Sequence, residues 1–293
     1  MTGLQLARGL SSRELHALAE LEARTVEADG GRLKLEWSVL EARTGENVED
    51  LLWWDGQRLL GFLGLYSFGA PAVELAGMVD PAARRRGIAS ALLDAALPLC
   101  FARSYQQALL VVPRASAAGR SLALARGAVL EHSEHAFALD GPPADGSRDP
   151  RTGLRPATPA DVDVLTHLLA SGFGHVPDDL GAQLATDSAR TLLVEVDGRT
   201  VGTVRLSLRE DVGAVYGFVV DSTWQGRGIG RDVLRRVCHD LRSEGARRVC
   251  LDVAVDNERA LGLYTALGFA AVTTEDYYSL RVADASSPAP AAP

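Results

Sequence analysis

Apolar residues recur with helical spacing at the start of the chain and again near its middle. Ser11 and Glu14 form a capping box, and the apolar residues at 15, 18 and 19 predict a helix behind it. Thr158 and Pro159 suit the first positions of a second helix, which the apolar residues at 162, 165, 168 and 169 continue. The two stretches therefore begin in the same way.

Each predicted helix is followed by two apolar runs joined by an Asp-Gly pair, which is a strong signal for a β-hairpin. Asp55-Gly56 separates residues 51–54 from 59–66, and Asp197-Gly198 separates residues 192–196 from 200–206. The order of elements is thus repeated beyond the first helix.

A glycine-containing turn follows in both halves, between an apolar strand and an amphipathic helix. One copy reads Gln-Gly-Arg-Gly-Ile-Gly over 225–230, and the other reads Arg-Arg-Arg-Gly-Ile-Ala over 84–89. Gly228 lies 141 residues after Gly87, and Gly268 lies 141 residues after Gly127. Two unrelated landmarks at one offset predict a duplicated domain.

The segments around the second turn complete an α/β pattern. We expect a strand over 214–220, a helix over 231–242, an extended segment over 248–255 and a last strand over 277–281. Asn257 is expected to cap a short helix that ends at Gly268. In the first half, Pro98 is expected to shorten or kink the helix after the turn.

Length and composition fit two globular domains. The 293 residues divide into domains over 1–140 and 151–282, joined by a Gly/Pro-rich linker over 141–150 and followed by a tail over 283–293 that we expect to be disordered.

The net charge of −8 argues against nucleic acid as a partner and is compatible with a cationic amine. No apolar stretch is long enough for a membrane span, and the first residues do not resemble a signal peptide. Cys100, Cys238 and Cys250 have no spacing typical of a zinc site or a disulfide framework. We therefore expect a cytoplasmic protein without a metal, either monomeric or homodimeric.

The repeated turn has the chemistry of a phosphate site. A helix that begins at a glycine turn exposes unpaired backbone N–H groups, and its dipole favours an anion. Glycine lets the phosphate approach the backbone closely. The spacing differs from that of the dinucleotide fingerprint, and no Gly-Lys-Ser/Thr follows as in a Walker loop. We therefore expect the turn to bind a diphosphate, but through neither of those two motifs.

The turn at 225–230, with Asn257 and Tyr264 downstream, resembles the GCN5-related N-acetyltransferase (GNAT) superfamily. The resemblance covers residues 154–282 and, more loosely, 4–139, and the tandem layout resembles the mycothiol synthase group. It implies acetyl-coenzyme A as the cofactor. It also implies, for each domain, a bent and mostly antiparallel sheet flanked by helices. The central strands of that sheet would splay, here between 214–220 and 248–255.

The same resemblance implies roles for individual residues of the second half. Asn257 would steady the pantetheine arm, and Tyr264 would act as the general acid that protonates the departing thiolate. The expected cofactor-binding residues also include the pantetheine contacts Phe218, Val219 and Val220 and the pyrophosphate contacts Gln225, Gly226, Arg227, Gly228, Ile229, Gly230 and Arg231.

The first half keeps the turn but has Ser116 and Ala123 at the positions of Asn257 and Tyr264. We expect this half to do no chemistry. A second cofactor site there is one reading, and a solvated arginine-rich loop without ligand is the other. The candidate residues of that second site are Met78, Val79, Arg84, Arg85, Arg86, Gly87, Ile88 and Ala89.

The general base is not assigned. Many family members carry a glutamate on the strand eleven residues before the Gln/Arg, where this chain has Ala214. Glu74 of the first half is interpreted as one residue out of register, facing the opposite side of its strand. Asp252, Glu210 and Asp211 are interpreted as solvated or structural carboxylates.

The function predicted is transfer of an acetyl group from acetyl-coenzyme A to a primary amine of a small molecule. The C-terminal domain would do this by direct attack of the amine on the thioester within a ternary complex. The alternatives are a non-catalytic acyl-coenzyme A sensor and a protein N-terminal acetyltransferase. The acceptor is not identified, and the loops over 27–45 and 171–189 are expected to select it.

Overall fold

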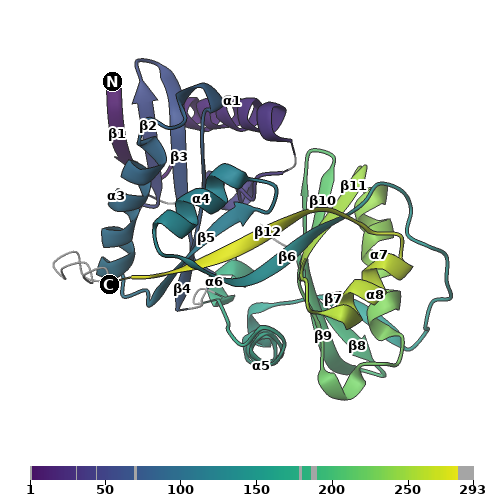
Figure 1. Ribbon diagram of the computed structural model, residues 1–293. Coiled ribbons are helices and arrows are strands. Elements are labelled where there is room, and N and C mark those ends of the chain that lie inside the picture. The colour runs from purple at the N-terminus through teal and green to yellow at the C-terminus, as the bar shows by residue number, and fades with distance from the viewer. Residues whose placement is uncertain are drawn as a thin grey trace. The chain divides into compact units, whose positions relative to one another are not determined.

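The protein folds into two compact α/β units (Figure 1). This computed structural model describes residues 2–30, 32–43, 45–68, 71–177, 180–185 and 190–282. Unit 1 comprises Met1–Ser67, Pro71–Ser133 and Thr273–Pro293, and unit 2 comprises Phe68–Ala70 and Glu134–Val272.

The sheet of unit 1 is mixed. β4 and β5 pair in parallel, whereas the neighbouring pairs are antiparallel. Its strand order is β1 (Thr2–Ala7), β2 (Asp50–Asp55), β3 (Arg58–Tyr66), β4 (Ala72–Val79), β5 (Gln107–Pro113) and β12 (Ala270–Arg281). Its helices are α1 (Ser12–Asp29), α2 (Trp37–Ala42), α3 (Ile88–Ala102) and α4 (Ala117–Ala125).

Successive residues of a strand face opposite sides of the sheet, so unit 1 has a core on each side. On one side, α1 and α2 pack against residues such as Phe62 and Met78. On the other side, α3 packs against residues such as Leu63, Leu75 and Leu110. The sheet is therefore covered on both faces.

Unit 2 repeats this plan. The parallel pair is β10–β11. Its strand order is β6 (Val129–Leu139), β11 (Arg248–Ala254), β10 (Val212–Val220), β9 (Arg199–Arg209), β8 (Arg190–Val196) and β7 (Thr152–Pro156). Its helices are α5 (Val162–Phe173), α6 (Leu180–Ala185), α7 (Ile229–Ser243) and α8 (Glu258–Ala266). α7 and α8 pack on one face and α5 and α6 on the other. The predicted fold class, a mixed sheet with splayed central strands and flanking helices, is confirmed in each unit.

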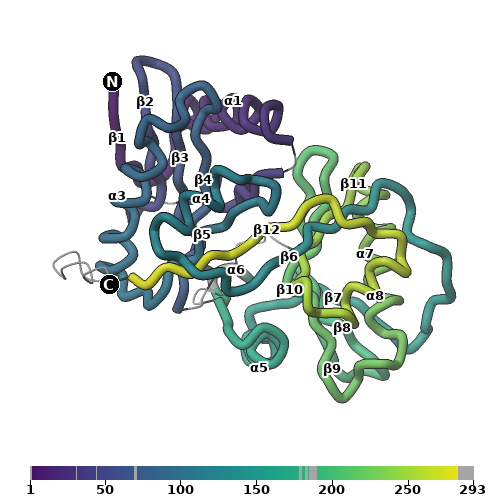
Figure 2. Tube along the Cα trace, in the orientation of Figure 1, coloured from purple at the N-terminus to yellow at the C-terminus, as the bar shows by residue number. Residues whose placement is uncertain are grey.

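The repeats are continuous in sequence, but the compact units are not. β6, the last strand of the first repeat, pairs with β11 in unit 2 through residues 134–139. β12, the last strand of the second repeat, pairs with β5 in unit 1 through residues 275–281. The first and last strands of the chain therefore both belong to unit 1 (Figure 2).

Several local predictions are confirmed. Ser11 and Glu14 form the capping box of α1. The Asp-Gly turns join β2 to β3 and β8 to β9. Asn257 caps α8 by accepting a hydrogen bond from the backbone N–H of Ala260, at 3.1 Å, and Gly268 has the expected left-handed backbone, with φ +97°.

Pro98 was expected to shorten or kink its helix, and the expected shortening is wrong. α3 runs through Pro98 to Ala102 and has 15 residues, the same length as α7. A proline removes one backbone donor from a helix. Here the buried face of α3, with Leu92, Leu93 and Cys100, offsets that loss.

The predicted linker has no helix or strand between Asp140 and Arg151. The predicted disordered tail lies outside the described residues. Among the described residues, no helix is long and apolar enough to cross a membrane.

Candidate functional site

The phosphate-type turn is built in the same way in both units. Asp80 and Asp221 directly follow their strands, and the carboxylate of each accepts a hydrogen bond from a backbone N–H two residues on, from Ala82 at 3.0 Å and from Thr223 at 2.9 Å. These contacts cap the short 3-10 turns Pro81–Ala83 and Ser222–Trp224.

Left-handed glycines then start the long helices. Gly87 precedes α3 with φ +80°, and Gly228 precedes α7 with φ +83°. Neither helix start has a side-chain cap. The first N–H groups of both helices are therefore available to an anion.

The first residue of each motif braces the turn. The Nε2 of Gln225 donates to the carbonyl of Val220 at 2.8 Å, and the Nε of Arg84 donates to the carbonyl of Val79 at 3.2 Å. Arg84 also binds both carboxylate oxygens of Asp29, at 2.8 and 2.6 Å. These two side chains hold the turn against the end of the strand, so the turn presents mainly its backbone to a ligand.

Several cations surround the two turns. Arg227 donates to the carbonyl of Thr223 at 3.0 Å and lies 4.8 Å from the centre of the Trp224 ring. Arg231 beside the turn of unit 2, and Arg85 and Arg86 in the turn of unit 1, are exposed. No described residue forms an ion pair or hydrogen bond with those three guanidinium groups. They remain available for phosphate oxygens.

The central strands part beside each turn. Along their described residues, β10 and β11 pair from Val212 to Ala214, and β4 and β5 pair from Ala72 to Leu75. Beyond Ala214, β10 is still paired with β9 along its other edge. The backbone of 218–220 therefore presents an open edge to the gap, where an extended ligand can add hydrogen bonds.

Tyr264 lies on α8, behind the cap that Asn257 provides. Its side chain is 8% exposed and packs near Phe137 and Phe269, with ring centres 6.2 and 6.1 Å away. Burial raises the pKa of Tyr264 to about 12. Its hydroxyl is therefore a proton donor at neutral pH.

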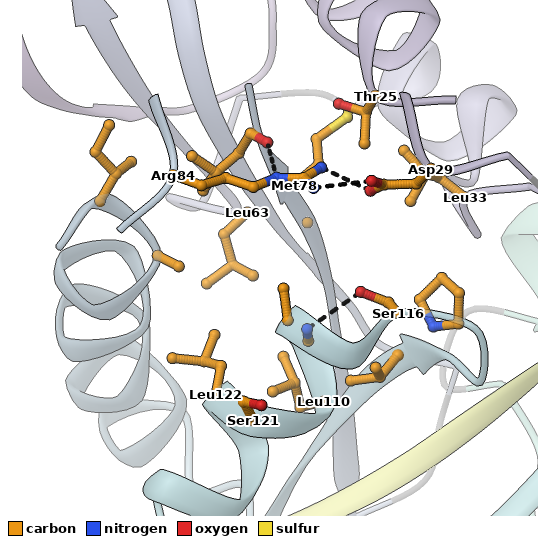
Figure 3. A pocket seen from close by; sticks show the side chains of 18 of the residues that line it. Thr25, Asp29, Leu33, Leu63, Met78, Arg84, Leu110, Ser116, Ser121 and Leu122 are labelled. Atoms are coloured by element: carbon orange, nitrogen blue, oxygen red, sulfur yellow. Dashed lines mark hydrogen bonds and ion pairs between the residues drawn. The ribbon is translucent and has the colours of Figure 1, made fainter. Parts of the chain in front are cut away.

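Unit 1 contains a cavity of about 770 Å³ at the gap between β4 and β5 (Figure 3). Leu63, Leu110 and Leu122 lie around it, and Asp29 and Arg84 form their ion pair at one side. Ala123, which replaces the tyrosine, is buried in the core of this unit. The cavity has the size of a small-molecule site.

One pair of aligned positions distinguishes the two gaps. Gly77 of β4 lines the cavity of unit 1, and a Cβ there would lie 2.3 Å from the carbonyl oxygen of Phe62. Phe218 occupies the position 141 residues later, and its ring would be 3.6 Å from a Cβ placed on Gly230. The ring of Phe218 therefore lies against the turn in unit 2, whereas Gly77 adds no side chain to the gap in unit 1.

The interpretation of Glu74 as out of register is wrong. Glu74 pairs with Tyr66 on one side and Leu109 on the other, and Ala214 pairs with the residues 141 positions after those two, Ser207 and Cys250.

The cause is an irregularity in β10. Its pairing with β9 shifts between Tyr216 and Val219, whereas the register of β4 with β3 does not shift. The extra residue changes the offset between the repeats from 141 to 140 upstream of it. A carboxylate oxygen of Glu74 lies 3.6 Å from the Nζ of Lys34. Unit 1 therefore keeps a glutamate at the strand position where unit 2 has alanine.

In both units a mixed sheet has parallel central strands that part next to a helix that starts at a glycine. The chain belongs to the acetyltransferase (GNAT) family, whose model matches residues 14–125 and 163–269. It is an N-acetyltransferase of the tandem kind, with one family domain in each repeat.

Relatives match most of the chain. A mycothiol acetyltransferase of Mycobacteroides abscessus is 31% identical over 287 residues, which cover 92% of this chain and 97% of that protein. A GCN5-related N-acetyltransferase from Sphaerobacter thermophilus superposes with a TM-score of 0.78 at 21% identity, covering 95% and 96% of the two chains. A tandem GNAT protein from the clavulanic acid biosynthesis pathway has a TM-score of 0.72 at 18% identity, covering 96% and 99%. The last two show the shared fold.

Proposed function

We propose that unit 2 transfers an acetyl group from acetyl-coenzyme A to the primary amine of a small molecule. The observation that carries this proposal is the placement of Tyr264 on α8, behind the cap at Asn257 and in the unit whose β10 has an open edge. Unit 1 has alanine at the corresponding position, Ala123. A proton donor is needed for transfer and not for binding alone.

The turn of unit 2 fits the diphosphate of the cofactor. Gly226 and Gly228 have φ of +76° and +83°, and a Cβ at either would meet nothing within 4 Å. That open space, next to the N-terminus of α7, is where phosphate oxygens would accept backbone N–H bonds. The residues proposed to hold the cofactor are Phe218, Val219, Val220, Gln225, Gly226, Arg227, Gly228, Ile229, Gly230, Arg231 and Asn257.

The proposed site residues contribute to the reaction in different ways. Bound acetyl-coenzyme A would supply the thioester. Ile229 is buried, so it contributes its backbone alone, and Gln225 acts by bracing the turn. Backbone N–H groups on the open edge of β10 would polarise the thioester carbonyl, and Tyr264 would give its proton to the leaving sulfur.

The amine must lose a proton, and Ala214 provides no base. We propose that water carries this proton to solvent. We expect the variant Ala214→Glu to raise kcat at pH 7 by about 10-fold, because it restores a carboxylate where unit 1 has Glu74. Val212→Glu, on the same strand at an exposed position, serves as the control. An unchanged kcat in Ala214→Glu would show that proton removal does not limit turnover.

Unit 1 is proposed as a second, non-catalytic coenzyme A site. Its cavity of about 770 Å³, its turn and the two exposed guanidinium groups of Arg85 and Arg86 support binding. The other candidates for this site are Met78, Val79, Arg84, Gly87, Ile88 and Ala89.

Replacement of Gly228 by tryptophan tests the cofactor site of unit 2. We expect Gly228→Trp to lower acetyl-coenzyme A-dependent thiol release, with a panel of primary amines, by more than about 100-fold, because the side chain would fill the phosphate cradle. Gly198→Trp is the matched control: Gly198 has φ +77°, open space around it and a place in the β8–β9 turn of the same unit. Equal losses in the two variants would trace the effect to backbone strain instead.

A further inference from the structure

A second cavity, of about 200 Å³, lies on the α5 face of unit 2. α5 supplies Leu165, Leu169 and Phe173 to its wall, and Leu180 of α6 closes another side. Tyr216 and Gly217 of β10 also line it. The walls are thus mainly apolar and aromatic.

The cavity lies at the part of β10 that the proposed reaction uses. Tyr216 and Gly217 come two and three residues after Ala214, the last described residue of β10 that pairs with β11, and they lie at the irregularity of β10. Phe218, the first of the proposed pantetheine contacts, is the next residue along the strand. A molecule held in this cavity would therefore lie beside the strand that is proposed to bind the pantetheine arm, where an acceptor could reach the thioester.

Aromatic side chains are exposed around this cavity to an unusual degree. Phe68, Phe173 and Tyr216 line it and are 36%, 46% and 38% exposed. Among the large apolar residues of the described chain that are exposed, the one further aromatic residue is Phe101, on α3 of unit 1. Exposed aromatic surface that gathers at one cavity is stabilised when an apolar ligand covers it.

The volume sets the size of the group that enters. An apolar cavity of about 150 Å³ holds one benzene molecule, and this cavity is slightly larger. We propose that the acceptor is a primary amine joined by a short chain to a single aromatic ring, and that the ring lies in this cavity. The inference rests on the acetyl transfer proposed above for unit 2 and gives its substrate class.

The test compares phenethylamine and glucosamine as acceptors for the full chain at saturating acetyl-coenzyme A. We expect kcat/KM to be at least about 100-fold higher for phenethylamine than for glucosamine. Phe173→Ala is expected to lower kcat/KM for phenethylamine about 10-fold or more, and to lower the value for glucosamine by a clearly smaller factor. Phe101→Ala, which removes a ring that is 45% exposed and lines neither cavity, is expected to change neither value.

Two results would overturn the inference while leaving acetyl transfer intact. One is glucosamine acting as well as phenethylamine, and the other is Phe173→Ala behaving like Phe101→Ala. If no amine releases thiol, equilibrium dialysis of phenethylamine against the chain saturated with coenzyme A separates the remaining cases. Binding of phenethylamine without release contradicts the proposed transfer alone, and no binding contradicts the acceptor class as well.

Discussion

Tyr264→Phe is expected to lower kcat by about 100-fold or more while changing the KM for acetyl-coenzyme A little. The substitution removes the phenolic proton and keeps the ring that packs against Phe137 and Phe269. Steady-state thiol release at saturating acceptor measures the effect. Tyr278→Phe is the matched control, since Tyr278 is 5% exposed and lies in the core of unit 1. Similar kcat values for the two variants would remove Tyr264 from the mechanism.

The pKa of the Tyr264 hydroxyl also predicts how kcat depends on pH above 7. Because burial raises the pKa of Tyr264 to about 12, the acid keeps its proton through pH 10. We expect kcat to show no alkaline decline from this group between pH 7 and pH 10. A decline with an apparent pKa near 8 that disappears in Tyr264→Phe would contradict the assignment.

Arg43→Met is expected to have the largest effect on stability. Arg43 follows α2, and its guanidinium pairs with Asp50 and donates to the carbonyl of Leu65 at 2.6 Å. The side chains of Arg43 and Asp50 are 3% and 0% exposed. Removal of the cation leaves a buried carboxylate without its partner, which costs about 3–5 kcal/mol of unfolding free energy at pH 7.5.

The pH dependence identifies the cause. Burial raises the pKa of Asp50 to about 6, against the opposing effect of Arg43. Its folded pKa thus lies above the unfolded value, so the carboxyl favours the folded state at low pH and loses that contribution as the pH rises through about 6. In Arg43→Met, urea denaturation should therefore show a smaller loss of stability at pH 5 than at pH 7.5. Arg58→Met is the exposed control, with a 57% exposed side chain that pairs with Asp80. Equal losses at both pH values would point to packing rather than charge.

The sequence predicted the features that depend on local chemistry. The capping box at Ser11, the Asp-Gly hairpins and the cap at Asn257 each satisfy backbone groups within a few residues, so spacing alone reveals them. The duplicated turn was visible for the same reason. Its residues recur at one offset because each helix start needs the same left-handed glycine, Gly87 or Gly228.

Features that depend on distant partners were not predictable. The sequences of β6 and β12 do not reveal that the two strands are exchanged between the units, because both have the composition of an ordinary sheet strand. The position of Glu74 was misread because one extra residue in β10 changes the offset between the repeats. One extra residue in a strand shifts the alternation of side chains between the two faces of the sheet for every residue upstream of it. Residue spacing reveals such a shift only when a second recognisable position lies on the same strand.

The two units carry different parts of one site. Unit 1 keeps Glu74 at the strand position of the base and has Ala123 in place of the acid, whereas unit 2 has Ala214 and Tyr264. The gap of unit 1 holds the larger of the two cavities described above, and the ring of Phe218 lies against the turn of unit 2. This distribution is consistent with binding in both units and transfer in unit 2.

Calorimetric titration of acetyl-coenzyme A into the full chain tests most directly whether both repeated turns hold the cofactor. We predict two sites, one lost in Gly228→Trp and the other lost in Gly87→Trp. Gly198→Trp and Gly56→Trp, at left-handed hairpin glycines of the two units with open space around them, should keep both sites. No binding to the unmodified chain, or two sites that survive both substitutions, would contradict the account.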